Sequence, residues 1–132
     1  MKQLSSQKKQ ELMMLHQQGN IEGATEMSKK LIKEYPKELL LHNILGVCQE
    51  AQGDLKGAAD CYQKAININP NIPELQFNLG AMLYALKNNK GAISHYQKAI
   101  ELNPRFTEAF FNLGITYQSQ NDYEAAIASY EQ

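Results

Sequence analysis

The sequence lacks the features that mark membrane and nucleic-acid proteins. No apolar run reaches the roughly eighteen residues that suggest a membrane span, and the start, MKQLSSQKKQ, has no apolar segment after its basic residues, unlike a secretory signal. Thirteen Lys and Arg against fourteen Asp and Glu give a net charge of −1. Such a balance argues against a basic patch for nucleic acid, and no lysine cluster suggests a membrane surface. We expect a cytoplasmic protein without either partner.

Motifs for catalysis and metal binding are also missing. The chain has no phosphate-binding loop, no HExxH and no paired CxxC. His16, His42 and His95 are scattered, as surface or packing histidines are. Cys48 and Cys61 are interpreted as small apolar residues in a reducing cytosol, with metal binding or disulfide chemistry as the alternative. The sequence therefore predicts a non-enzyme with no catalytic residue, cofactor or metal.

What the chain has is an internal repeat. The letters FNLG stand at 77–80 and again at 111–114, and several other residue types recur with the same 34-residue period. The recurring sets are Pro36, Pro70 and Pro104; Asn20, Asp54, Asn88 and Asp122; Gly46, Gly80 and Gly114; and Tyr62, Tyr96 and Tyr130.

Each repeat is predicted to be a pair of helices. Apolar residues recur at steps of three and four, and each stripe is interrupted by a polar turn and closed before a proline. The first helices are expected at 5–18, 38–52, 73–86 and 107–120, and the second at 20–34, 54–68, 88–102 and 122–132. Gly19 and Gly53 suit the left-handed backbone conformation that often follows the last residue of a helix. Lys87 and Asn121 stand at the equivalent positions of the later repeats. Glycines such as Gly80 would let the paired helices approach closely.

The repeats resemble the tetratricopeptide repeat (TPR) family. The residues that carry this are Leu-Gly in the first helices, as at Leu79-Gly80, the Ala, Tyr and Ala of the second helices, and the closing prolines. The resemblance implies an all-α, right-handed superhelical solenoid of antiparallel helix pairs. About three and three-quarter repeats are expected in one array, at 5–38, 39–72, 73–106 and 107–132, the last one truncated. The first departs most, with Ser28 where Tyr62 and Tyr96 stand later.

The resemblance also implies a function, because TPR proteins bind proteins or peptides and use the first helices to line a concave groove. Carried over by position, the peptide-binding groove would be lined by Asn43, Val47, Phe77, Asn78, Ala81, Tyr84, Phe111, Asn112 and Ile115. The asparagines can pair with a peptide backbone. Phe77 and Phe111 suit either the groove or packing between repeats, whereas Tyr84 has no aromatic counterpart and is expected at the surface.

The expected partner has apolar anchors and a neutral or basic flank. A chaperone C-terminal carboxylate tail is excluded, because Glu74 and Glu108 stand where the carboxylate clamp of that TPR subclass needs positive charge. Two alternatives remain open. One is self-assembly through uncapped terminal repeats, with Ala125 and Ala128 exposed, and the other is a regulatory segment of a larger enzyme, as in the glycosyltransferase-associated arrays that the chain resembles.

Overall fold

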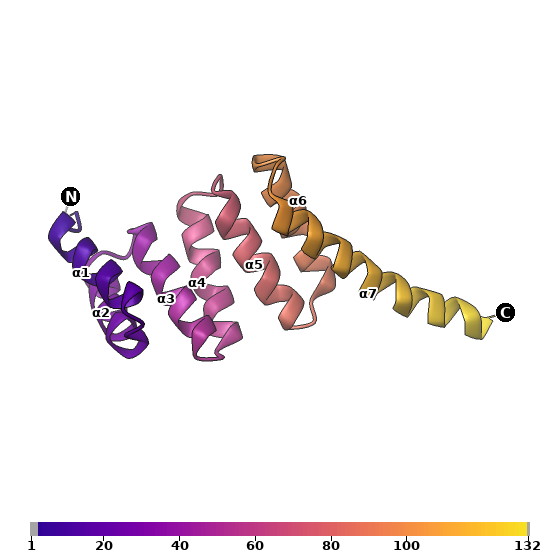
Figure 1. Cartoon of the computed structure of the whole chain (residues 1–132), viewed down its shortest axis with the longest axis horizontal. Coiled ribbons are helices and arrows are strands. Elements are labelled where there is room, and N and C mark those ends of the chain that lie inside the picture. The colour runs from indigo at the N-terminus through magenta and orange to yellow at the C-terminus, as the bar shows by residue number, and fades with distance from the viewer. Residues whose placement is uncertain (1–2, 132) are drawn as a thin grey trace. The chain divides into compact units, whose positions relative to one another are not determined.

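A computed structural model describes the backbone of residues 3–131 and the side chains of residues 3–121. Within that range the chain is all-helical (Figure 1). The helices are α1 Ser6–Gln17, α2 Ile21–Glu34, α3 Leu39–Ala51, α4 Leu55–Ile68, α5 Pro73–Ala85, α6 Asn89–Leu102 and α7 Thr107–Glu131. The first six begin and end within one residue of the bounds that the sequence predicts. None of the described helices is long and apolar enough to cross a membrane.

The turn inside each helix pair is built by the residues that recur there. Asn20, Asp54 and Asn88 cap the second helices, and each side-chain oxygen accepts a hydrogen bond from the backbone N–H three residues on. The residue before each cap is left-handed, with φ of 76° at Gly19, 82° at Gly53 and 67° at Lys87. The predicted left-handed position is thus confirmed in three turns, once at a residue other than glycine.

Residues up to Pro70 form one compact unit, which contains α1 to α4. Its core is a continuous apolar cluster to which α1, α2 and α3 all contribute, with Leu12, Leu41 and Cys48 completely buried. The contact between the paired helices α3 and α4 depends on Gly46, because a Cβ atom there would lie 2.8 Å from the ring of Tyr62. Two helices can pack this closely only where the residue between them, here glycine, has no side chain.

The first pair carries the reverse combination of sizes at the matching positions. Leu12 stands in the place of Gly46, and Ser28 stands in the place of Tyr62, 34 residues earlier in both cases. Both residues are 0% exposed. A large residue on α1 and a small one on α2 therefore fill the space that a glycine and a tyrosine fill in the next repeat, as close packing demands.

The second unit begins at Asn71 and contains α5, α6 and α7. Here too a Cβ atom at the glycine of the first helix, Gly80, would lie 2.8 Å from the ring of the second-helix tyrosine, Tyr96. Leu75, Leu79 and Ala99 are buried beside them. The small residues at these positions thus have the close-approach role that the sequence predicts.

The fourth pair of helices is not formed. The sequence predicts helices at 107–120 and 122–132 with a turn at Asn121, but α7 runs unbroken from Thr107 to Glu131 (Figure 1). That prediction is wrong because asparagine also fits the right-handed helix, and among the described residues no second helix packs against Gly114 as α6 packs against Gly80. The side chains of Ala125 and Ala128, which the sequence places on an exposed end face, lie outside the described residues.

Candidate functional site

Four of the predicted groove residues meet in the second unit. Ala81 and Tyr84 from α5 and Asn112 and Ile115 from α7 line a hollow of about 120 Å³. Positions 81 and 115 are one repeat apart, and the Tyr84 hydroxyl lies 3.4 Å from Oγ of Ser119. The two first helices therefore run side by side in the same direction, and the hollow lies between their matching faces.

Tyr96 and Thr116 complete this hollow. Burial raises the pKa of the Tyr96 phenol, and the hydrogen bond from the Asn112 side chain opposes that shift by lowering the pKa. A bond that lowers a phenol pKa is one in which the amide N–H donates to the phenol oxygen. The Asn112 amide then keeps its carbonyl oxygen as an acceptor and its second N–H as a donor. Thr116 donates to the Asn112 backbone oxygen at 2.8 Å and is completely buried.

A second, wider hollow of about 350 Å³ adjoins the first at Tyr84. Lys87, Asn89 and Ser119 line it together with Tyr84 and Ala85. The Tyr84 ring, 36% exposed, belongs to both hollows. It therefore lies at the surface, where the sequence places it, and divides an apolar hollow from a polar one.

The two phenylalanines differ in environment. The ring of Phe77 packs on Tyr96 at a centroid distance of 5.7 Å and on Phe106 at 5.0 Å, and its side chain is half-buried. Phe111, in the equivalent position of α7, is 68% exposed. The packing interpretation therefore fits Phe77, and the surface interpretation fits Phe111.

The remaining predicted groove residues are partly buried. Asn78 lies on α5 beside the residues already described, whereas Asn43 and Val47 lie on α3 in the other unit. Asn43 is unusual because its Oδ1 is buried without a hydrogen-bond partner among the described residues. A buried carbonyl oxygen without a donor is costly.

Sequence reasoning missed Tyr96, Thr116, Ser119 and Lys87. Ser119 could have been predicted from helical spacing, because residues 112, 115 and 119 share one helical face. Tyr96 was assigned only to helix packing, and its phenol also forms part of the hollow. Lys87 was assigned only to the turn.

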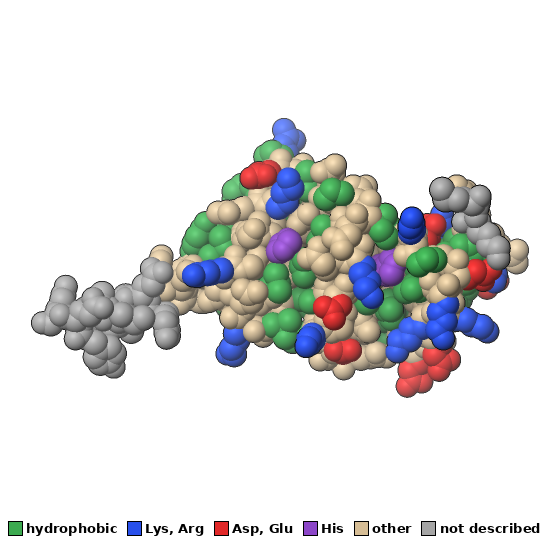
Figure 2. All heavy atoms as spheres, turned by 180° about the vertical axis from the view of Figure 1, so that it is seen from behind, with side chains coloured by type: hydrophobic (Ala, Val, Ile, Leu, Met, Phe, Trp, Pro, Cys, Tyr) green, Lys and Arg blue, Asp and Glu red, His purple; other side chains and the backbone are tan. Residues whose placement is uncertain are grey.

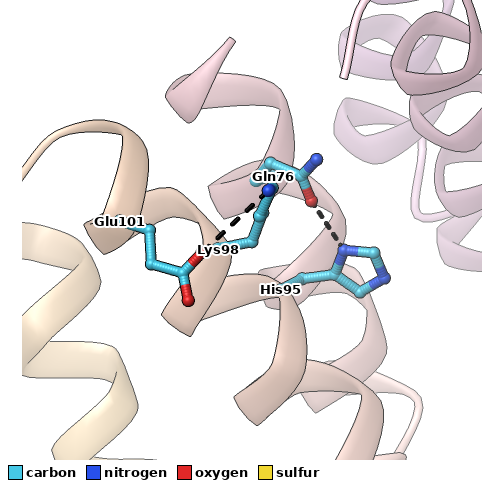
Figure 3. Close-up of polar contacts among 4 residues, drawn as sticks. All are labelled: Gln76, His95, Lys98 and Glu101. Carbon is cyan, nitrogen blue, oxygen red and sulfur yellow. Dashed lines mark hydrogen bonds and ion pairs between the residues drawn. The ribbon is translucent and has the colours of Figure 1, made fainter. Parts of the chain in front are cut away.

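A separate polar pocket lies between α5 and α6. His95 Nδ1 is 2.8 Å from Oε1 of Gln76, and Lys98 forms an ion pair with Glu101 at 3.9 Å (Figure 3). Burial lowers the pKa of His95. His95 thus acts as a packed, hydrogen-bonded histidine of the helix pair.

The described residues offer no group of three or more His, Cys, Asp and Glu placed to hold a metal ion. Cys48 and Cys61 are free and buried. The Cys61 thiol donates to Oε1 of Gln49 at 3.0 Å, and burial raises its pKa. On the face in Figure 2, basic and acidic side chains are interspersed.

Comparison with known proteins places these helix pairs in a family. The TPR repeat model matches residues 51–87 and 80–121. No curated protein sequence matches the chain. Among solved structures, the crystal structure of MamA is 26% identical with a TM-score of 0.79, covering 89% of this chain and 69% of that one.

Two further structures share the fold at lower identity. The first TPR of Spaghetti (RPAP3), bound to the HSP90 peptide SRMEEVD, has a TM-score of 0.82 at 21% identity, covering 89% of this chain and 97% of that one. PcrH, in complex with the chaperone binding region of PopD, has a TM-score of 0.80 at 18% identity, covering 91% of this chain and 98% of that one. The predicted all-α superhelical fold class is therefore confirmed. The chain belongs to the tetratricopeptide repeat family.

Proposed function

We propose that this chain is a protein-interaction scaffold that binds a peptide segment on the α5–α7 face of its second unit. The carrying observation is that Ala81, Tyr84, Asn112 and Ile115, four residues at equivalent or neighbouring repeat positions, line one hollow. Concave sites with apolar walls and a few fixed polar groups are typical of ligand binding.

The two hollows suit different parts of one peptide. The smaller one has room for a single aliphatic or aromatic anchor between Ala81 and Ile115. Phe111, largely exposed on the same helix, would extend the apolar contact. The wider hollow beyond Tyr84 offers Lys87 and Ser119 to polar groups of the segment that follows the anchor. Buried aromatic and aliphatic anchors carry most of the energy in such interfaces.

The asparagines would hold the peptide backbone. With one of its two N–H groups engaged by Tyr96, the Asn112 amide would accept a peptide N–H at its carbonyl oxygen. Asn78 would act in the same way from α5. Asn43 in the first unit has a buried carbonyl oxygen that lacks a donor among the described residues. Asn43 and Val47, which repeat position places in the groove, would contact a peptide on the first unit.

The charges at the helix starts favour a neutral or basic flank. Glu74 and Glu108 lie in the first turns of α5 and α7, where both are exposed. The peptide in the RPAP3 structure, SRMEEVD, is acidic. We propose a different partner chemistry here, because these carboxylates would repel an acidic tail.

A phage-displayed library of random peptides tests this function. Peptides selected on the full chain should share an apolar anchor, and their binding should fall at least about tenfold with Ile115→Arg or Tyr84→Ala, as truncation of an anchor contact does. Lys98→Ala is the matched control, since Lys98 is an exposed residue of α6 outside both hollows. Selected peptides whose binding survives both site variants would place the interaction elsewhere.

A further inference from the structure

The first helix of a repeat has one face that its own second helix covers. On α5 this face includes Gln76, whose Oε1 bonds His95, and Gly80, which receives the Tyr96 ring. On α3 the matching residues are His42 and Gly46. His42 is 5% exposed and Gln76 is 3% exposed, so the face is buried in both units.

On α7 the same face is open. Phe110 occupies the position of Gln76 and is 50% exposed. Gly114 occupies the position of Gly80, and no described atom would lie within 4 Å of a Cβ atom there. Tyr117, three residues further on, is 39% exposed, although its hydroxyl accepts a hydrogen bond from Nε2 of Gln97 on α6 at 2.7 Å. Phe110, Gly114 and Tyr117 therefore form an uncovered apolar stripe at helical spacing, here called the α7 stripe.

The chain itself contains the segment that matches this stripe. Residues 122–131, DYEAAIASYE, repeat the second-helix sequence, with Tyr130 standing 34 residues after Tyr96. Their side chains lie outside the described residues, but their backbone continues α7. Sixteen residues of one straight helix separate position 114 from position 130 by about 24 Å. An unbroken α7 therefore carries the matching segment away from its own stripe.

We propose that two copies of this chain exchange these segments, so that residues 122–131 of each copy cover the α7 stripe of the other. The partner's tyrosine at position 130 would rest on Gly114 as Tyr96 rests on Gly80. Phe110 and Tyr117 would lose their exposure to the same helix. Reciprocal exchange of an identical element gives a closed, two-fold dimer.

The inference does not depend on the proposed peptide site. Tyr84, Asn112 and Ile115 belong to the hollow between α5 and α7. The α7 stripe lies on positions whose counterparts in α3 and α5 face the second helix of the same repeat. Dimer formation and peptide binding can therefore succeed or fail separately.

Two single substitutions should weaken the dimer. Gly114→Leu would place a side chain where the partner's tyrosine must lie, and Tyr130→Ser would leave that space empty. Each should raise the dissociation constant of the dimer about tenfold or more, as overpacking and cavities do. The measurement is sedimentation equilibrium of the full chain over a wide concentration range. Far-UV circular dichroism checks that each variant keeps its helices, which the open space around Gly114 allows.

Mixing the two single variants is the decisive step. In a mixed dimer one contact pairs glycine with tyrosine, and the other pairs leucine with serine, as Leu12 and Ser28 are paired in the first repeat. Native mass spectrometry of the mixture should therefore show a heterodimer that is tighter than either homodimer. The double variant Gly114→Leu with Tyr130→Ser should dimerise more tightly than either single variant.

Three results would overturn the exchange. The first is a monomeric mass at all concentrations, and the second is a dimer that neither substitution weakens. The third is a pair of weakened variants that gain nothing on mixing, because then each segment folds back on its own chain or the two residues never meet.

Discussion

Replacing Gly46 by leucine and Tyr62 by serine in one chain should cost far less stability than the two single replacements added together. The first repeat already holds leucine and serine at these places, and both Leu12 and Ser28 are fully buried. The double replacement therefore gives the second helix pair the leucine and serine that the first helix pair already has at these positions.

The single replacements set the scale. Tyr62 is completely buried and donates to Oε1 of Glu50 at 2.9 Å. Losing its ring should cost about 3–5 kcal/mol, and losing the hydrogen bond about 1 kcal/mol more. At Gly46 a Cβ atom would lie 2.8 Å from the Tyr62 ring. Overpacking of this kind costs about 1–3 kcal/mol, of which better helix propensity returns up to about 1 kcal/mol.

Added together, the single replacements predict a loss of about 4–9 kcal/mol, whereas the double variant should lose about 2–3 kcal/mol. Urea unfolding followed by circular dichroism measures the free energy of unfolding of the unmodified chain, the two single variants and the double variant. The reverse exchange, Leu12→Gly with Ser28→Tyr, is the matched control in the first repeat. Additivity of the two losses within about 0.5 kcal/mol would refute the idea that these positions compensate in size.

Three further predictions concern single side chains. Ser28→Ala should raise the free energy of unfolding by about 1 kcal/mol in urea titration, because the buried Oγ has no partner among the described residues; a loss of stability would reveal an unseen hydrogen bond. Asp54→Ala should cost about 1 kcal/mol by the same assay, since its side chain caps α4 through Gly57 N–H, whereas exposed Asp60→Ala should cost little; equal effects would contradict the cap. Burial lowers the pKa of His95 below 6.5, so the unfolded state binds the proton more readily. Stability should therefore fall as pH drops through about 6.5 toward the folded pKa, and His95→Gln should flatten that part of the curve; a variant with the same pH dependence would show that other groups cause it.

Much of the fold was predictable because local signals and the repeat agree. The cap at Asn88, the proline at the start of α5 and the apolar stripes all indicate the same boundaries, and six helices follow them. Agreement between local preference and tertiary packing is what makes a sequence specify its fold. The exchange of sizes at Leu12 and Ser28 was not predictable, because the sequence shows only that the first repeat departs from the others.

The candidate site was predictable in outline. Repeat position alone selected Ala81, Tyr84, Asn112 and Ile115, since a solenoid presents equivalent residues on equivalent faces. Repeat position did not separate Phe77 from Phe111. The packing of Phe77 depends on a neighbouring ring at Phe106, which is not part of the repeat pattern.

Lys87 and Asn121 show why the last repeat departed from its prediction. Both occupy the place of a left-handed glycine, and lysine is the less suited of the two to that conformation. Yet Lys87 adopts φ of 67°, while α7 continues through Asn121. Local preference therefore does not decide between turn and helix at this position. The turn at Lys87 is held by the packing of a second helix, with Tyr96 fitted against Gly80. At Gly114 no described atom makes the corresponding contact. In the proposed exchange, a helix from another copy covers the α7 stripe, and α7 therefore stays straight.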